Sequence, residues 1–301
     1  MKSIRILLFA FPFILRKIRW SMGDRSPISA TLKLTTQCNL SCKHCPWLKQ
    51  QNTDMPTEQW KDIIRKLQNR GVKFLVFEGG EPTFREDLQE LIEFGQSLGM
   101  LTLVVTNCTH SLRDYSPEMF LISLDGLQEE HDILRGKGTF DLVLKNLPTT
   151  NVHKRALISL SHRNIHQLEA MLDFFAPLVD SFWFSFVYDY QTRESNAALH
   201  SEEKKVAALK IVSLWKKYPI ANSLSYLKKI GSDRPCRDWL LSTVTSDGTV
   251  HSGCMIATLE QCRCEDCELA CHRELSDTIY SFWKPSFFRN WNCIERVSEK
   301  K

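Results

Sequence analysis

The chain has 301 residues, of which 43% are hydrophobic and 25% charged, and its formal net charge is +4. This size suits one large α/β domain with a small addition, and the composition excludes a low-complexity or repeat protein. Five cations and no acid lie in residues 1–20, so removing these cations leaves a charge of −1 on the rest. A body so close to neutral excludes recognition of nucleic acid by charge, and no nucleic-acid partner is expected.

Residues 1–24 form a basic and apolar N-terminal arm. An apolar run over 6–15 is flanked by cations and is shorter than the roughly 20 residues that span a bilayer. Arg16 to Trp20 follow it where a signal peptide would need small residues. Two interpretations stay open: an interfacial anchor that contacts the membrane through residues 1–20, and a helix that covers one end of the main domain.

Strand and helix patterns alternate through the middle of the chain. Strands are predicted at 30–35, 73–77, 101–105, 119–124, 155–160 and 181–187, and helices at 57–70, 87–98, 140–147, 165–175 and 202–217. Strands that alternate with helices of this length indicate a parallel sheet, and right-handed crossovers curl such a sheet toward a barrel. In barrels of this kind the functional residues lie at the C-terminal ends of the strands.

Three cysteines follow the first predicted strand with the spacing CxxxCxxC: Cys38, Cys42 and Cys45. Thiolates this close together can hold three irons of a [4Fe–4S] cluster, which needs four ligands when it is fully coordinated. Three ligands leave one iron open for chemistry. A zinc loop is the alternative, although paired CxxC or Cys/His ligands do not accompany this triplet.

The triplet and the motifs after it resemble the radical S-adenosylmethionine (SAM) superfamily. Phe77 to Pro82 match the family's GGEP element, Thr106-Asn107 match the end of the third strand, and the stretch from Ser123 to Gly136 matches S-x-D-G … H-D-x-x-R-G. The resemblance covers roughly residues 30 to 190. It implies a partial (β/α)6 TIM-like barrel over residues 25–230 that cleaves SAM reductively to a 5′-deoxyadenosyl radical, which then abstracts hydrogen from a substrate.

The resemblance also implies roles for individual residues. Cys38, Cys42 and Cys45 would hold the [4Fe–4S] cluster, and Arg135 would pair with the SAM carboxylate. The other expected SAM contacts are His44, Gly79, Gly80, Glu81, Pro82, Asn107 and Ser123. Asp125 is expected to shape the turn into Gly126, and Ser161 and Asn164 are weaker candidates for ribose contacts. Cys108 stands where the family usually has glycine. No catalytic side chain is assigned, and the expected reductant is a flavodoxin or ferredoxin.

A second cysteine-rich region occupies residues 231–301. Its Asp247-Gly248 pair, flanked by β-branched residues, predicts a hairpin that brings Cys236 and Cys254 together. The region resembles the SPASM and twitch extensions, which implies a small α+β module with one auxiliary [4Fe–4S] cluster. The favoured ligands are Cys236, Cys254, Cys264 and Cys267, with Cys271 and Cys262 as alternates. A second auxiliary cluster that uses Cys293 and a structural zinc ion are the alternatives.

The predicted function is that of a radical SAM enzyme in the reducing cytoplasm, with peripheral contact to the inner face of the membrane as an extension. Its substrate would be a peptide, as for a maturase, or a small molecule. A membrane lipid or isoprenoid is the alternative, suggested by the apolar arm and the aromatic residues of the sixth strand. The alternative of another class is a non-catalytic iron–sulfur or zinc scaffold or sensor.

Overall fold

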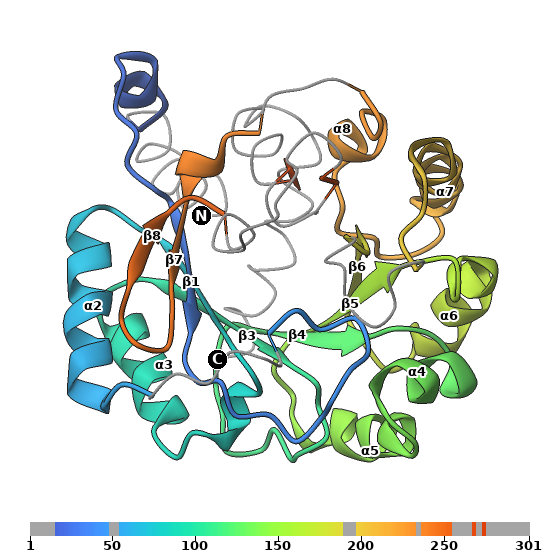
Figure 1. Ribbon diagram of the computed structural model, residues 1–301, viewed down its shortest axis with the longest axis horizontal. Helices are drawn as coiled ribbons and strands as arrows, with labels where there is room; N and C mark the ends of the chain where they lie inside the picture. The colour runs from blue at the N-terminus through green and yellow to red at the C-terminus, as the bar shows by residue number, and fades with distance from the viewer. Residues whose placement is uncertain are drawn as a thin grey trace, which may run out of the picture.

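The computed structural model describes residues 16–47, 54–188, 197–232, 236–254, 267–268 and 273–274. They contain one sheet of eight strands in the order β6-β5-β4-β3-β2-β1-β7-β8 (Figure 1). The strands are β1 (Ser29–Lys33), β2 (Phe74–Glu78), β3 (Leu101–Thr106), β4 (Met119–Leu124), β5 (Lys154–Leu160), β6 (Ser181–Phe186), β7 (Leu241–Val244) and β8 (Val250–Ser252). All neighbouring pairs are parallel except β7 with β8.

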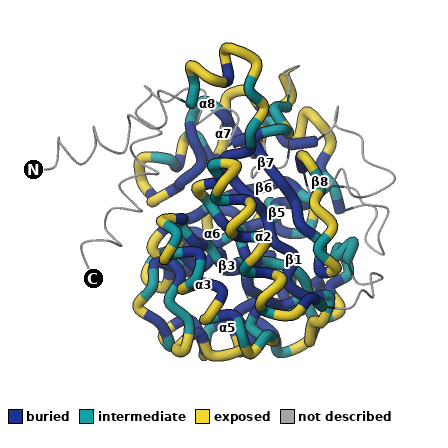
Figure 2. Tube along the Cα trace, turned by 90° about the vertical axis from the view of Figure 1, so that its left-hand side faces the viewer, coloured by how far each residue is buried: buried dark blue, intermediate teal, exposed yellow. Residues whose placement is uncertain are grey.

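Helices cover the outer face of the curved sheet (Figure 1). They are α2 (Thr57–Asn69), α3 (Leu88–Ser97), α4 (Gln128–Arg135), α5 (Thr139–Asn146) and α6 (Leu168–Phe175). Two further helices, α7 (Ser201–Leu214) and α8 (Leu224–Leu227), follow β6 in the chain and lie above it in the view of Figure 1. Short 3-10 turns lie at Pro82–Phe84, Leu147–Thr149, Ile165–Gln167 and Asp238–Leu240. Most residues of the strands, and the helix residues that face the sheet, are buried (Figure 2).

The alternation of side chains along each strand explains this packing. In β1, Leu32 points toward the helix layer and joins the core with Phe77 of β2 and Trp60 of α2, all fully buried. The opposite face of β1 carries Thr31 and Lys33, because successive side chains of a strand point to opposite sides. The six-strand barrel portion therefore has an apolar outer core and an inner face that bears polar side chains.

The predicted α/β fold is confirmed: each of the six predicted strands is present, and the parallel sheet does not close. The hairpin predicted around Asp247-Gly248 is also confirmed, as β7 and β8. The sequence did not indicate that β7 pairs in parallel with β1, from Ser29 opposite Leu241 to Leu32 opposite Val244. This pairing attaches the start of the cysteine-rich region directly to the strand that precedes the CxxxCxxC loop.

Residues 16–21 are helical and dock onto the domain. Trp20 is only 2% exposed and stacks edge-on against Trp239, with ring centroids 5.4 Å apart. Arg16 donates to the carbonyl oxygens of Gly71 and Pro27. This part of the arm therefore covers the domain, and Trp20 does not reach a membrane interface. The run over 6–15 lies outside the described residues, so the membrane contact expected of residues 1–20 stays a prediction.

Among the described residues, no helix combines the length and the apolar character that crossing a bilayer requires.

Candidate active site

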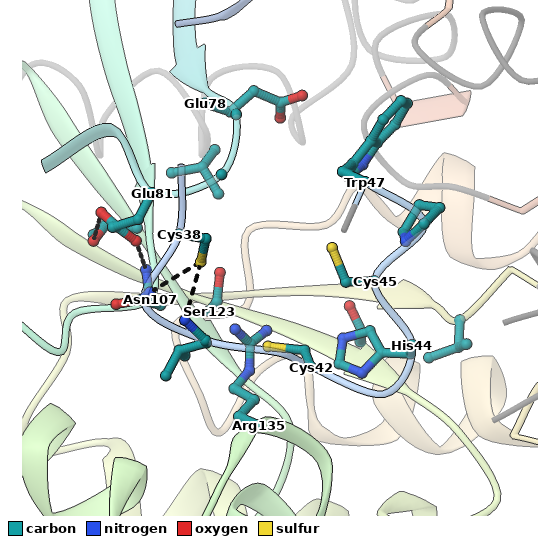
Figure 3. Close-up of a pocket in the computed structure, with 18 of the residues that line it drawn as sticks. Cys38, Cys42, His44, Cys45, Trp47, Glu78, Glu81, Asn107, Ser123 and Arg135 are labelled. Carbon is teal, nitrogen blue, oxygen red and sulfur yellow. Dashed lines mark hydrogen bonds between the residues drawn. The ribbon is translucent and has the colours of Figure 1, made fainter. Parts of the chain in front are cut away.

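The sequence motifs meet in one cavity of about 250 Å³ at the C-terminal ends of the strands (Figure 3). All three cysteines of the CxxxCxxC loop line this cavity, and so do seven of the eight predicted SAM contacts: His44, Gly79, Gly80, Glu81, Asn107, Ser123 and Arg135. Pro82 is not in the lining; it is buried and starts the 3-10 turn after β2. The structure thus gathers side chains from six separate segments around the cysteine loop.

The glycine pair after β2 holds the cysteine loop in place. The amide of Gly80 donates to the Thr35 carbonyl at 2.7 Å, and the amide of Glu81 donates to the Gln37 carbonyl at 2.8 Å. A Cβ on Gly80 would lie 2.0 Å from the Gln37 oxygen, and Gly79 has φ +142°. Glycine is required here because the backbone after β2 runs against the three residues that lead into Cys38.

The three thiols are not gathered as closely as the ligands of a bound zinc ion. In a tetrahedral zinc site with Zn–S bonds of about 2.3 Å, the sulfur atoms lie about 3.8 Å apart. Within the described ranges, the one set of three metal-ligating side chains with donor atoms within 4.8 Å of one another is His162, His200 and Glu203. Cys38, Cys42 and Cys45 are not such a set, and in an iron–sulfur cluster each thiolate would hold a different iron.

The exposed set of His162, His200 and Glu203 does not form a convincing cation site. His200 caps the N-terminus of α7, and Glu203 lies in the first turn of that helix. The amide of His200 already donates to the Glu203 carboxylate at 2.8 Å. The dipole of a helix favours anions and disfavours cations at this end.

Asp125 lies behind the cavity wall and holds two of its residues. Its Oδ2 accepts from Nε of Arg135 at 2.5 Å and lies 3.5 Å from Nε2 of His44. Burial raises the pKa of Asp125, but Arg135 and His44 outweigh that effect and leave the pKa below its ordinary value. One carboxylate therefore ties the cysteine loop to the end of α4.

Arg135 keeps its charge and its terminal nitrogens for the cavity. Burial lowers the pKa of Arg135, but Asp125 and then Cys42 raise it above its ordinary value. Asp125 takes the Nε–H, while the two terminal nitrogens point toward Ser123 and the cysteines (Figure 3). A guanidinium held by its Nε and open at its other nitrogens suits a bidentate carboxylate partner.

Glu81 is used within the protein rather than turned toward the cavity. Its carboxylate accepts four hydrogen bonds, from the amide and hydroxyl of Thr83, the hydroxyl of Thr106 at 2.7 Å and the amide of Asn107 at 2.7 Å. Burial raises its pKa, and these four bonds oppose the shift. Glu81 thus joins the ends of β2 and β3 and fixes the backbone of Asn107.

Asn107 links the third strand to the cysteine loop. Its side-chain nitrogen, Nδ2, donates to Oδ1 of Asn39 at 3.0 Å and lies 4.0 Å from the sulfur of Cys38. The next residue, Cys108, has φ +57°, the left-handed backbone that glycine adopts without strain. The cysteine has therefore kept the glycine conformation, at a cost of about 1 kcal/mol.

Ser161 and Asn164, the weaker candidates for ribose contacts, do not line the cavity. Asn164 is fully buried, and its side chain accepts from the Ser161 amide at 2.9 Å and donates to the carbonyls of Asp125 and Ser159. The expectation is corrected because this amide braces the ends of β4 and β5 instead. Ser159, two residues before Ser161, lines the cavity instead. The alternation of side chains along β5 could have indicated this residue.

Two lining residues, Trp47 and Glu78, were not expected from the sequence, whereas Tyr188 at the end of the sixth strand was a residue that could face the substrate. Trp47 and Glu78 line the cavity near Cys45 (Figure 3), and Tyr188 lines it after β6. Glu78 directly precedes the glycine pair, and Tyr188 follows β6 among aromatic residues that the sequence indicated as candidate substrate contacts. These residues give the cavity a wall that differs chemically from the cysteine side.

The second cysteine group is described in part. Cys254, which follows β8, and Cys267 are buried, and Cys236 is half-buried. The short segment with Cys267 docks on α8, where the Tyr226 hydroxyl donates to the Glu268 carbonyl at 2.8 Å. Cys264 and Cys271, and the alternates Cys262 and Cys293, lie outside the described residues. The predicted ligand set of this group therefore stays a prediction.

Comparison with known proteins places this site in a family. The model of the Radical SAM superfamily matches residues 32–174. Fe-coproporphyrin III synthase of Methanosarcina barkeri is 30% identical over 164 residues, which are 50% of this chain and 41% of that protein. Mycofactocin maturase MftC of Mycolicibacterium smegmatis is 30% identical over 165 residues, 50% of this chain and 42% of that protein. The matches thus span less than half the length of these curated relatives.

Solved structures share the fold over nearly the whole chain. SuiB of Streptococcus suis bound to S-adenosylmethionine superposes with a TM-score of 0.65 at 15% identity and covers 95% of this chain and 72% of that one. SuiB bound to its precursor peptide SuiA gives the same TM-score at 16% identity, with 95% and 71% covered. The family match, the relatives and the fold agree with the motifs in the cavity: the chain carries a Radical SAM superfamily domain, which spans residues 32–174.

Proposed function

We propose that the chain is a radical SAM enzyme that modifies a peptide. The observation that carries this proposal is the cavity itself, where the three cysteines, the free side of Arg135 and the glycine-supported loop face one space. When bound, a [4Fe–4S] cluster supplies the electron that splits SAM and generates the radical that abstracts hydrogen. The protein's task is to hold and shield the reacting groups.

Cys38, Cys42 and Cys45 would hold this cluster. Burial raises the pKa of Cys42 to about 11, so this thiol would release a proton when it binds a metal. Arg135 would bind the SAM carboxylate, while Ser123 and Asn107 offer hydrogen bonds to the rest of the molecule. Glu81 would act through Asn107, because its carboxylate already accepts four bonds within the protein.

The peptide substrate is supported by the relatives and by the cavity wall. Two comparison proteins support this class of substrate: MftC is named as a maturase, and SuiB is described in a complex with the precursor peptide SuiA. The aromatic and acidic residues Trp47, Tyr188 and Glu78 form the wall beyond the cysteines and offer apolar and charged contacts. The region around Cys236, Cys254 and Cys267 would be a SPASM-like or twitch-like module with an auxiliary [4Fe–4S] cluster.

A small-molecule substrate is the second candidate. It is favoured by the 30% identity to Fe-coproporphyrin III synthase, which is named for a tetrapyrrole rather than a peptide. Incubating the enzyme separately with precursor peptides from neighbouring genes and with iron coproporphyrins would separate the two. The class of compound that stimulates formation of 5′-deoxyadenosine and itself changes in mass is the substrate class.

The activity itself is tested without a substrate. Protein reconstituted under anaerobic conditions is incubated with SAM and dithionite, and 5′-deoxyadenosine is measured. The matched control is Cys108→Ala, since Cys108 is a buried cysteine outside both groups. Formation of the nucleoside by the wild type and by this control, but not by Cys42→Ala, supports the proposal. No nucleoside with or without peptide, tetrapyrrole or lipid would support a non-catalytic scaffold instead.

A further inference from the structure

Lys33 is a buried cation at the end of β1. Its side chain is 6% exposed, and Nζ lies 3.2 Å from Oε1 of Glu78, the residue that faces it across the β1–β2 pair. The same ammonium lies 3.2 Å from the centroid of the Trp47 ring. A carboxylate and an aromatic face are the two kinds of group that compensate a desolvated ammonium, so the position is built to keep a charge.

This charge lies between the two cysteine groups. Trp47, whose ring faces the ammonium, is two residues beyond Cys45. Lys33 and Trp47 also line a small cavity with Thr245 and Ser246, the start of the hairpin that leads to Cys254. Lys33 is therefore in contact with the loop of one cysteine group and beside the hairpin of the other.

The electrostatic interactions of Lys33 agree with this placement. Burial is the largest influence and leaves the pKa of Lys33 below its ordinary value, while Glu78 is the strongest opposing influence. The thiols of Cys45 and Cys254 both act in the same direction as Glu78. One ammonium thus interacts with a predicted ligand in each cysteine group, and the interior of the barrel screens these interactions less than water would.

A nearby fixed cation has a defined effect on a redox group. Reduction adds one negative charge, and an ammonium stabilises that charge, whereas a carboxylate at a similar distance destabilises it. At an effective dielectric constant of about 20, one charge some 10 Å away changes the equilibrium by about tenfold. Lys33 and Glu78 should therefore act in opposite directions on the same group.

We propose that Lys33 raises the reduction potentials of the metal groups held by the two cysteine sets, and that Glu78 lowers them. The inference rests on the proposed function, because it assumes clusters at these cysteines. Lys33 is a positioning and tuning residue rather than a catalytic one: it touches neither the cysteines nor the space in which SAM would bind. It is the shared charge through which the barrel loop and the C-terminal cysteine region influence each other.

The test is a redox titration of the anaerobically reconstituted full chain, followed by EPR. For Lys33→Met we expect the ratio of reduced to oxidised cluster at a fixed potential to fall about tenfold, which is about 59 mV for a one-electron couple. For Glu78→Gln we expect a rise of similar size. Lys33→Arg, which keeps the charge, and Lys73→Met, which removes an exposed lysine, should titrate like the wild type.

The double variant Lys33→Met with Glu78→Gln removes the pair as a unit and should return the potentials close to those of the wild type. Potentials that stay unchanged in both single variants, or move in the same direction in both, would overturn the proposal. If Lys33→Met does not fold, Glu78→Gln decides the sign on its own. A wild-type chain without any cluster signal would overturn the proposed function and this inference together, whereas normal signals with insensitive potentials would overturn this inference alone.

Discussion

Arg135 and Asp125 form a buried ion pair in which Nε of the guanidinium lies 2.5 Å from Oδ2 of the carboxylate. The pair joins the last residue of α4 to the residue after β4, and Asp125 is 1% exposed. The geometry fixes which nitrogens of Arg135 remain for a ligand. Its consequence is that a residue outside the cavity orients the guanidinium that we propose binds the SAM carboxylate.

Asp125→Asn is expected to weaken SAM binding about 10- to 100-fold, the usual effect of removing the group that orients a ligating residue. It also leaves a buried cation without its partner and should lower the free energy of unfolding by about 3 kcal/mol. Calorimetric titration with SAM and denaturant unfolding measure the two effects. Asp141→Asn, at an exposed aspartate of α5, is the control. Unchanged SAM affinity in Asp125→Asn would show that Arg135 does not depend on this pair.

His131 makes the stability of the domain dependent on pH. The ring is fully buried and accepts from the Asp125 amide at 3.4 Å. Burial, with a further contribution from Arg135, lowers the pKa of His131 from 6.5 to about 4. Between these values the unfolded chain binds a proton that the folded chain does not, so stability rises with pH.

We therefore expect the free energy of unfolding to fall by about 3 kcal/mol between pH 7 and pH 4 because of this residue alone. Denaturant titrations at several pH values measure the slope. His131→Gln cannot be protonated in this range and should remove that part of the pH dependence. The same slope in wild type and His131→Gln would assign the acid sensitivity to other groups.

Gly80→Ala is expected to displace the cysteine loop. The new methyl group would lie 2.0 Å from the Gln37 carbonyl oxygen. This oxygen belongs to the backbone, so the clash is relieved only if the backbone that leads into Cys38 moves. Iron content after anaerobic reconstitution should fall by the amount carried by one cluster, about four irons per chain. Gly138→Ala is a suitable control because its Cβ meets nothing within 4 Å and costs only the left-handed backbone strain of about 1 kcal/mol. Full iron content in Gly80→Ala would contradict the close packing.

The docking of residues 16–24 can be tested through Trp20. Trp20→Ala removes a buried ring that packs on Trp239, so the segment should detach and trypsin should cleave faster after Arg16, Lys17 and Arg19. Met22→Ala, at a side chain that is 81% exposed, should not change the cleavage rate. Equal cleavage of the two variants would show that Trp20 does not hold this segment.

The barrel and most of the cavity were predictable because their signals are local. Each strand of the sheet is a short apolar run between turn residues, as in Leu101–Thr106, and the cavity-lining motifs follow directly on strand ends. Parallel strands place those ends at one edge, so adjacency in space follows from order in sequence. The glycine pair at Gly79 and Gly80 was recognisable for the same reason.

What could not be predicted depends on contacts between distant segments. The interaction of Asp125 with both Arg135 and His44 requires the α4 end and the cysteine loop to be placed in three dimensions. The parallel pairing of β7 with β1 joins residues more than 200 positions apart and leaves no periodic signal. Nothing in the sequence around Lys33 indicates its partners, because only the fold places Glu78 and Trp47 next to its ammonium.

The central claim is that the loop with Cys38, Cys42 and Cys45 holds an iron–sulfur cluster that SAM reaches directly. EPR spectra of the dithionite-reduced, anaerobically reconstituted protein, recorded before and after addition of SAM, measure this most directly. We expect a [4Fe–4S] signal that changes on SAM addition and that is absent when the three cysteines are replaced by alanine. A signal that survives this replacement, or that does not respond to SAM in the wild type, would contradict it.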